Sequence, residues 1–134
     1  MEPKPRVLFL CTGNSARSQI AEGFLRQLAD DRYEVFSAGT LPKGVHPRSV
    51  DVMREVGVDL SRHTSENVDR YLEQEFDYVI TVCDRARDHC PVFSGSESIH
   101  WSFNDPAAVH RSRQLEEFRR VRDQILERIQ TFVS

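Results

Sequence analysis

Residues 6–23 read RVLFLCTGNSARSQIAEG, and this stretch decides the fold of the chain. It opens with a continuous apolar run, residues 7–10, and a run without alternation is typical of a strand buried on both faces of a parallel sheet. The run ends at Cys11, and a helical pattern of apolar residues begins a few residues later, at about Arg17. A strand, a short loop and a helix in this order indicate an α/β fold with right-handed crossovers.

The loop between this strand and this helix has the composition of an anion-binding loop. Cys11 and Arg17 are separated by five residues, all of them small or polar. A loop that leads into a helix N-terminus turns backbone N–H groups toward an anion, and the Arg17 guanidinium can grip two of its oxygens. We expect Gly13 to adopt a positive φ and to leave room for the anion, and Asn14 and Ser18 to hold the loop through side-chain hydrogen bonds. The same field favours a thiolate at Cys11, so the pattern predicts thiolate chemistry on a phosphate-like oxyanion.

The rest of the chain continues the alternation of strands and helices. Ser15 or Ser18 is expected to cap the first helix and Thr64 the third, and the polar segment 84–95 is predicted to be a mobile loop or a frayed helix. Together the elements predict a three-layer sandwich in which helices flank a four-stranded parallel sheet. The expected strands are 6–10, 33–37, 76–82 and 98–101, and the expected helices are 17–29, 46–56, 65–72 and 112–132.

Composition limits the class of protein. With 134 residues, the chain is expected to form a single domain over 1–134. A formal net charge of −3 argues against nucleic acid or a membrane surface as a partner. The N-terminal apolar run is shorter than the roughly 7–15 residues of a signal-peptide core, and no stretch reaches the roughly 20 apolar residues that span a bilayer. These features predict a cytoplasmic protein.

Three cysteines are present: Cys11, Cys83 and Cys90. In a cytoplasmic protein they do not indicate a structural disulfide framework, and the odd number suits a free nucleophile plus a pair. Cys83 follows the third expected strand as Cys11 follows the first. Because the carboxyl ends of parallel strands share one edge of a sheet, the topology can bring these two thiols together.

The motif CTGNSARS with the following QIAEG resembles the low-molecular-weight protein tyrosine phosphatase superfamily, and within it the arsenate reductases coupled to thioredoxin. Two motifs are specific: the anion loop, and Cys83-x6-Cys90-Pro91, which separates the reductases from the phosphatases. The resemblance implies a low-molecular-weight phosphatase-like fold with flavodoxin-like topology, and it runs over nearly the whole chain. It includes FSAG at 36–39, DLSRHTS at 59–65, DYVITVCDRARDHCP at 77–91, HWSFNDPA at 100–107 and FRRVRDQI at 118–125.

This resemblance implies a mechanism. Cys11 attacks arsenate, and Asp105 protonates the departing oxygen as general acid. Cys83 then attacks the Cys11 sulfur, arsenite leaves and a Cys11–Cys83 disulfide remains. Cys90 attacks Cys83 to give a Cys83–Cys90 disulfide, which thioredoxin reduces. Arg17 and the loop residues bind the oxyanion, and phosphate or sulfate can take its place; the loop residues are Thr12, Gly13, Asn14, Ser15, Ala16 and Ser18.

The resemblance implies no obligatory cofactor and a monomeric protein, but it brings a candidate potassium site beside the loop. Oxygen ligands suit a hard cation. Glu66 stands where an Asp is usual in the relatives, and Ala16 stands where they often carry a cysteine, so the chain has no thiol beyond the three of the relay. The positions that match the potassium ligands are Asn14, Glu22, Ser37, Thr64 and Ser65.

Other interpretations remain open. A protein tyrosine phosphatase would use the same loop but resolve its intermediate with water, and weak activity on aryl phosphates is expected of the loop in any case. Phosphatases of the family usually have aromatic residues after Asp-Pro, where this chain has Ala107 and Ala108. A non-catalytic protein could hold trivalent arsenic on its three thiols. A zinc site is disfavoured by the ligand spacing; its ligands would be Cys83, His89, Cys90 and His100.

Several other side chains are interpreted as structural, with no part in the chemistry. His46, His63 and His110 have no partner visible in the sequence and are interpreted as surface or helix-capping residues. Pro47 is expected near the first turn of the helix that His46 opens. Trp101 and Phe103 are expected to pack the loop that carries Asp105 against the core.

Overall fold

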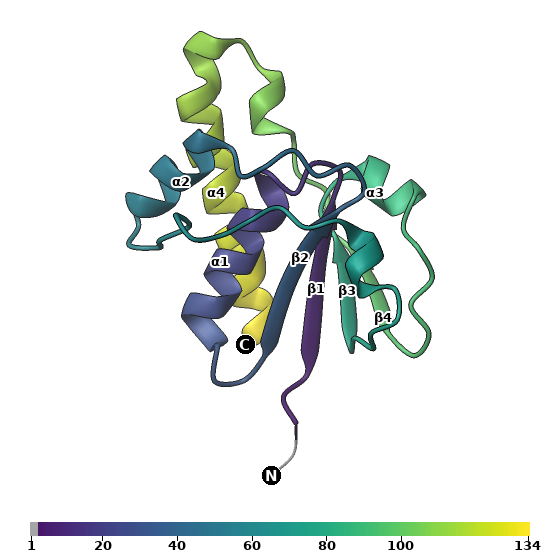
Figure 1. Ribbon diagram of the computed structural model, residues 1–134. Helices are drawn as coiled ribbons and strands as arrows, with labels where there is room; N and C mark the ends of the chain where they lie inside the picture. Colours follow the sequence, from purple (N-terminus) through teal and green to yellow (C-terminus); the bar gives the residue numbers. More distant parts are fainter. Residues whose placement is uncertain (1–2) are drawn as a thin grey trace.

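The computed structural model describes residues 3–134 and contains one four-stranded parallel sheet with helices on both faces (Figure 1). This confirms the predicted fold, although element boundaries differ from the expected ones by a few residues. The strands lie in the order β2-β1-β3-β4. They are β1 (Arg6–Cys11), β2 (Glu34–Gly39), β3 (Tyr78–Thr81) and β4 (Glu97–His100). The α-helices are α1 (Arg17–Ala29), α2 (Pro47–Arg54), α3 (Asp84–Asp88) and α4 (Arg111–Val133), and the 3-10 helices are η1 (Val68–Tyr71) and η2 (Pro106–Ala108).

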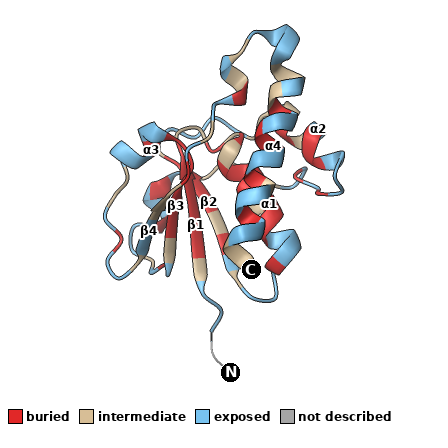
Figure 2. Ribbon diagram, turned by 180° about the vertical axis from the view of Figure 1, so that it is seen from behind, coloured by how far each residue is buried: buried red, intermediate tan, exposed pale blue. Residues whose placement is uncertain are grey.

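Strand β1 is the centre of the core, because both faces of the sheet are covered. The side chains of residues 7–10 are fully buried, as the unbroken apolar run predicts (Figure 2). Helices α1 and α4 pack against each other over one face, and η1 lies over the other (Figure 1). Each face is filled by an aromatic cluster. The clusters are Phe9, Trp101 and Phe132 on the α4 side, and Phe36, Tyr71, Phe76 and Phe93 on the η1 side.

The parallel register places the carboxyl ends of the strands at one edge of the sheet. Cys11 of β1 pairs with Gly39 of β2, and Leu10 pairs with Thr81 of β3. Cys83 follows the end of β3 by two residues. Cys11 and Cys83 therefore reach the same edge, at the opposite end of the sheet from the chain termini (Figure 1).

Strand β2 ends in a glycine because the anion loop passes directly over it. A Cβ added at Gly39 would lie 2.5 Å from the carbonyl oxygen of Thr12 and 2.9 Å from the backbone nitrogen of Asn14. Both are backbone atoms, and the Thr12 carbonyl is fixed by a 2.8 Å hydrogen bond from the backbone N–H of Leu41. Any side chain at Gly39 would therefore displace the loop.

The start of α1 differs from the expectation. Its N-cap residue is Ala16, which makes no side-chain capping bond, so neither Ser15 nor Ser18 is the cap. The Ser18 hydroxyl instead contacts Cys11 and Asn14. Because no side chain caps α1, its first backbone N–H groups are left for a ligand.

Two later segments also differ. The helix expected at 65–72 is reduced to the 3-10 helix η1, and its cap is Asn67 rather than Thr64; the Asn67 side chain accepts a 2.9 Å hydrogen bond from the Asp69 N–H. Within 84–95, only the five residues of α3 are helical. None of the described helices is both long and apolar enough to cross a bilayer.

A cluster of charged side chains fixes α4 to the end of α2. The side chain of Arg122 is only 11% exposed, and its Nη1 donates to the Val52 carbonyl at 2.9 Å and to the Glu55 carboxylate at 2.8 Å. Arg119 donates to the same carboxylate from Nε at 3.0 Å and from Nη2 at 2.7 Å. Hydrogen bonds from Arg119, and then from Arg122, lower the pKa of Glu55 to about 2.

Replacing Gly39 by alanine tests the close approach of the loop. We expect Gly39→Ala to lower the free energy of unfolding by about 1–3 kcal/mol, because the methyl group overlaps backbone atoms. The matched control is Gly13→Ala, whose added Cβ meets only flexible side-chain atoms at 3.3 Å or more; we expect a change within about 0.5 kcal/mol. Urea denaturation measures both, and equal losses would contradict the prediction.

The charged cluster predicts a pH dependence of stability. The folded-state pKa of Glu55, about 2, lies below its ordinary value of 4.5, so its carboxylate stabilises the folded chain above about pH 4.5. That contribution is lost as the pH falls toward 2. We expect urea denaturation to show a larger loss of stability between about pH 5 and about pH 3 for wild type than for Glu55→Gln. Glu73→Gln, a residue without an ion pair among the described residues, should behave as wild type.

Candidate active site

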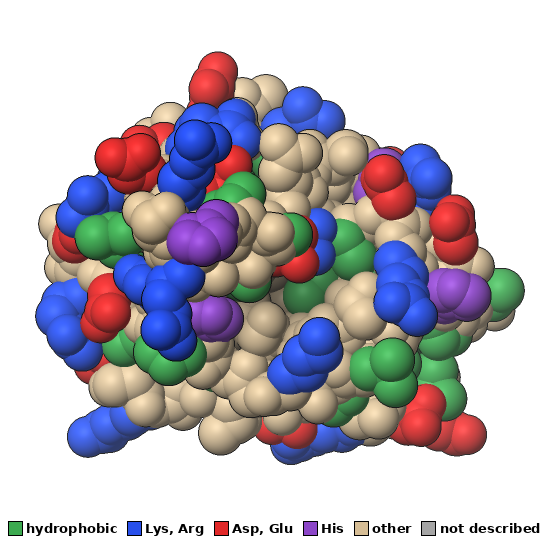
Figure 3. Space-filling model, turned by 90° about the horizontal axis from the view of Figure 1, so that it is seen from above, with side chains coloured by type: hydrophobic (Ala, Val, Ile, Leu, Met, Phe, Trp, Pro, Cys, Tyr) green, Lys and Arg blue, Asp and Glu red, His purple; other side chains and the backbone are tan. Residues whose placement is uncertain are grey.

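A cleft of about 670 Å³ opens at the carboxyl edge of the sheet. Figure 3 looks onto this face and shows the hollow, with basic side chains spaced around its rim and an acidic side chain beside a basic one at its mouth. The cleft brings together the anion loop, the end of β3 and the loop that precedes η2. Its lining includes Cys11, Thr12, Gly13, Ser15, Ala16, Arg17, Cys83 and Asp105.

The Cys11 sulfur sits at the start of the anion loop among hydrogen-bond donors. The backbone N–H of Asn14 donates to Cys11 Sγ at 3.2 Å, and Ser18 Oγ lies 2.8 Å from the same sulfur. Ser18 Oγ already accepts a 2.7 Å hydrogen bond from Asn14 Nδ2, which leaves the hydroxyl proton for the sulfur. The Cys11 sulfur is thus surrounded by hydrogen-bond donors and lies near the partial positive charge of the N-terminus of α1.

The buried amide of Asn14 connects the loop to its surroundings. Its Nδ2 donates to Ser18 Oγ and, at 2.9 Å, to Ser37 Oγ. Its Oδ1 accepts from the Glu66 N–H at 2.9 Å and from Gln19 Nε2 at 3.2 Å. The predicted roles of Asn14 and Ser18 in holding the loop are therefore confirmed.

The positive φ expected at Gly13 falls one residue later. Asn14 has φ 46°, and it is the only non-glycine residue with positive φ in the described chain. Asparagine adopts this left-handed conformation more readily than most residues. The prediction for Gly13 was wrong, and the side-chain bonds of Asn14 explain why the loop turns there.

Arg17 links the anion loop to the segment that carries Asp105. Its Nη1 donates to the carbonyl of Phe103 at 3.1 Å, and its Nη2 lies 3.9 Å from Asp105 Oδ2. Asp105 caps η2 by accepting a 2.9 Å hydrogen bond from the Ala107 N–H. The Asp105 side chain is 47% exposed. Asp105 thus lies on the exposed side of the cleft that Cys11 also lines.

Cys83 shares the cleft, as the topology predicts. Its side chain is buried, and its Sγ lies 3.5 Å from Thr12 Oγ1 of the anion loop. The same sulfur accepts a 3.4 Å hydrogen bond from the Ala86 N–H and so caps α3. A hydrogen bond from His100 lowers the pKa of the Asp84 carboxyl, which lies 2.9 Å from His100 Nε2 and ties the start of α3 to β4.

Cys90 lies beyond the other end of α3, outside the lining of the cleft. It is half-buried, and its thiol donates to the Pro91 carbonyl at 3.3 Å. Burial raises the pKa of the Cys90 thiol, which keeps the proton on the sulfur. All three cysteines are reduced in this structure.

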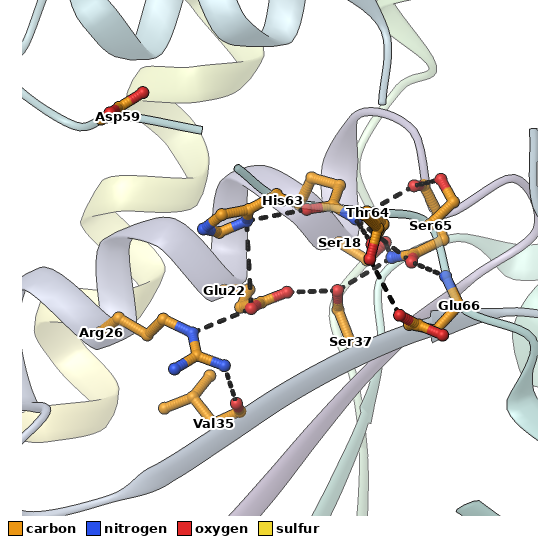
Figure 4. Close-up of polar contacts among 12 residues, drawn as sticks. Ser18, Glu22, Arg26, Val35, Ser37, Asp59, His63, Thr64, Ser65 and Glu66 are labelled. Carbon is orange, nitrogen blue, oxygen red and sulfur yellow. Dashed lines mark hydrogen bonds and ion pairs between the residues drawn. The ribbon is translucent and has the colours of Figure 1, made fainter. Parts of the chain in front are cut away.

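The five candidate potassium residues come together in one network (Figure 4). Ser37 Oγ donates to Glu22 Oε1 at 2.5 Å, and Ser65 Oγ donates to the Asn14 carbonyl at 2.5 Å. Thr64 is part of the cluster through its carbonyl, which accepts from Gln19 Nε2 at 3.1 Å. Arg26 Nε contacts the Glu22 carboxylate at 2.8 Å. The atoms of the five candidate residues that could coordinate a cation are all oxygens, the type of ligand that suits potassium.

The residues considered for zinc do not gather into such a site. Within residues 3–134, no three His, Cys, Asp or Glu side chains come together as metal ligands. Both ring nitrogens of His100 are engaged, with Thr81 Oγ1 at 2.7 Å and with Asp84.

Three residues of the site were missed or underestimated in the sequence. Gly39 makes room for the anion loop, and Gln19 donates a hydrogen bond to Asn14. These roles depend on neighbours distant in sequence or on the loop geometry, so no local sequence pattern predicts them. His46 caps α2 as interpreted, through Nδ1, but it also lies on the wall of the cleft. His110 caps α4. Trp101 is buried as expected.

Comparison with known proteins agrees with the site. The chain matches the family described as low molecular weight phosphotyrosine protein phosphatase over residues 6–134. It is 46% identical over 134 residues to a protein named arsenate reductase from Halalkalibacterium halodurans, and the match covers 98% of this chain and 96% of the relative. It is 42% identical over 130 residues to arsenate reductase 2 from Staphylococcus saprophyticus, with 96% of each chain covered.

Solved structures show the same relationship. A structure described as an arsenate reductase in the phosphate binding state superposes with a TM-score of 0.79 at 33% identity, covering 96% of each chain. A thioredoxin-dependent arsenate reductase from Corynebacterium glutamicum gives a TM-score of 0.68 at 32% identity, covering 97% of this chain and 64% of the other. Matched over almost its whole length, the chain belongs to the low-molecular-weight phosphotyrosine protein phosphatase family, as its CTGNSARS loop indicated.

Proposed function

We propose that the chain is an arsenate reductase that resolves its arsenic–sulfur intermediate with Cys83 and is regenerated through Cys90. Its relatives named arsenate reductase support the reaction. The observation that carries the proposal is the second thiol in the cleft: Cys83 lines it with Cys11, and its sulfur contacts Thr12 of the anion loop. A phosphatase needs only Cys11, because water resolves its intermediate.

The first step is attack of the Cys11 thiolate on arsenic. The loop N–H groups and the Arg17 guanidinium hold the oxygens that stay on arsenic. Asp105 gives its proton to the departing oxygen, which leaves as water when it already carries one proton. A sulfur–arsenic bond replaces an oxygen–arsenic bond, and arsenic remains pentavalent.

The second step is the reduction. The Cys83 thiolate attacks Cys11 Sγ, the sulfur–arsenic bond breaks, and its electron pair stays on arsenic, which leaves as trivalent arsenite. The two sulfurs lose the two electrons that arsenic gains, and a Cys11–Cys83 disulfide forms. Cys83 lines the same cleft as Cys11, so this step joins two thiols of one site.

The third step moves the disulfide outward. The Cys90 thiolate attacks Cys83 Sγ, forms Cys83–Cys90 and releases Cys11 as a thiolate. Cys90 lies outside the cleft, so the short segment between the two cysteines must rearrange. A dithiol protein of the thioredoxin class then reduces Cys83–Cys90, in keeping with the thioredoxin-dependent enzyme among the similar structures. Every group of this sequence comes from one chain, so a monomer is sufficient for the proposed reaction.

Cysteine variants test the relay in a coupled assay of arsenate-dependent NADPH oxidation with thioredoxin and thioredoxin reductase. We expect wild type to turn over, Cys83→Ser to fall to background because arsenic keeps its bond to Cys11, and Cys90→Ser to stop after one turnover. Non-reducing mass spectrometry should then find the Cys11–Cys83 disulfide in Cys90→Ser.

An internal control separates loss of the relay from loss of the loop. Hydrolysis of an aryl phosphate needs Cys11 and Arg17 but not Cys83, so weak activity should persist in Cys83→Ser. Undiminished multiple turnover of arsenate in Cys83→Ser would contradict the relay. A wild type that binds trivalent arsenic on its thiols but never turns over would favour the non-catalytic binding protein.

We also propose that the oxygen cluster around Glu22 holds a potassium ion. The carboxylate of Glu22, the hydroxyl groups of Ser37 and Ser65, and the carbonyl oxygens of Asn14 and Thr64 would be its ligands. The cluster joins α1, β2 and the segment before η1 to the anion loop (Figure 4). A cation there would stiffen the loop from behind without touching the oxyanion.

Thermal unfolding tests the ion site. We expect potassium chloride to raise the unfolding temperature by a few degrees over lithium chloride at equal ionic strength, because an ion that binds only the folded chain stabilises it. Glu22→Gln should lose this difference, whereas Glu73→Gln should keep it. Equal unfolding temperatures of wild type in the two salts would overturn the site.

A further inference from the structure

One side chain on the wall of the cleft has no part in the thiol relay. His46 lies immediately before α2 and lines the same cleft as Cys11 and Asp105. Its backbone N–H donates to the Ser15 carbonyl at 3.0 Å, which ties it to the anion loop. Its ring packs on Phe118 of α4, with ring centroids 4.9 Å apart. The imidazole is therefore held in one place.

The hydrogen bond at Nδ1 fixes the charge and tautomer of His46. Nδ1 accepts a 3.1 Å hydrogen bond from the Arg48 backbone N–H, so it carries no proton. A neutral imidazole with an unprotonated Nδ1 has its proton on Nε2. Burial, and then the neighbouring Arg48, lower the pKa of His46, while Asp105 acts in the opposite direction. The neutral Nε2–H form is the one that keeps the helix cap.

The Nε2–H group is left for a ligand. No atom of the described residues forms a hydrogen bond with His46 Nε2. Every side-chain nitrogen and oxygen that is buried from solvent among these residues has a hydrogen-bond partner. Nε2 is therefore open to solvent, and His46 is one of the residues that line the cleft. The elements that flank the cleft, α2 and α3, lie on opposite sides of this edge of the sheet (Figure 1). His46 immediately precedes α2 and Cys83 immediately precedes α3, so the two residues reach the cleft from different elements.

A neutral donor suits this position better than a cation. Asp105 must hold a proton to act as general acid in the proposed reaction. Arg17 already lies 3.9 Å from Asp105. An imidazole N–H binds an anionic oxygen without placing a second positive charge beside Asp105.

We propose that His46 is an oxyanion-binding residue of this site, whose neutral imidazole donates Nε2–H to an oxygen of the bound tetrahedral oxyanion. The proposal deepens the proposed function, because it assigns one more contact to the same substrate. It adds a side-chain hydrogen-bond donor from the segment that precedes α2. The other donors to the oxyanion are Arg17 and the N–H groups of the anion loop.

Two substitutions separate this role from the helix cap. In His46→Asn the side-chain oxygen can still accept from the Arg48 N–H, since asparagine is among the best capping residues, but the Nε2 donor is gone. In His46→Gln the amide Nε2–H2 can reach the position of the imidazole Nε2, but the close acceptor for the cap is lost. We therefore expect His46→Gln to keep oxyanion binding but lose thermal stability, and His46→Asn to keep thermal stability but lose oxyanion binding.

Binding is measured without turnover, in a Cys83→Ser, Cys90→Ser background that leaves Cys11 as the only cysteine of the chain. Inorganic phosphate should protect Cys11 from alkylation by iodoacetamide. We expect half-protection to need roughly tenfold more phosphate in His46→Asn, as for loss of one hydrogen bond to a charged group. His46→Gln should stay within about twofold of its parent, despite a lower unfolding temperature.

The outcomes are distinct. Parent-like protection in His46→Asn, or equal weakening in both variants, would overturn the role of His46 while leaving the proposed function intact. Failure of phosphate and arsenate to protect Cys11 in the parent would overturn the oxyanion site itself, and the proposed function with it. If phosphate binding weakened only in the variant whose unfolding temperature is lowered, His46 would act only as a helix cap.

Discussion

The site depends on the buried amide of Asn14. An anion loop must turn its backbone N–H groups toward one point, and that geometry leaves the chain in a conformation it would not keep alone. Asn14 adopts the left-handed backbone conformation at the turn and connects its side chain to Ser18, Ser37, Gln19 and the Glu66 backbone. These partners come from α1, from β2 and from the segment before η1, so the packed domain helps to order the loop.

This arrangement explains how one loop can serve two reactions. In the function we propose, Cys11 with its loop, Arg17 and Asp105 are sufficient to attack a tetrahedral oxyanion and to release one oxygen from it. The fate of the intermediate then depends on the nucleophile that meets it. At the end of β3 this chain places the buried thiol of Cys83 within 3.5 Å of Thr12 Oγ1. In the relay we propose, the thiol that follows this neighbouring strand decides between hydrolysis and reduction.

Local patterns in the sequence were enough to predict the fold and most of the site. The apolar run before Cys11 and the alternation of strands with helices predicted the sheet, and the edge rule for parallel strands brought Cys83 to Cys11. Features that depend on spatial neighbours were not predictable in this way. Gly39 is required by a backbone that crosses it, the positive φ belongs to Asn14 rather than Gly13, and His46 shows its place on the cleft wall only once α2 is set beside the loop.

The sulfur cap of α3 has a consequence for the timing of the relay. Cys83 Sγ accepts the hydrogen bond of the Ala86 N–H that begins this five-residue helix. In the relay we propose, a Cys83 sulfur that bonds Cys11 leaves that position, so the chemical step would remove the cap of a helix too short to be stable alone. Release of α3 would free Cys90 only after arsenite has formed. The order of the two thiol exchanges would then be set by one atom, and the outer thiol would stay protonated and half-buried until it is needed.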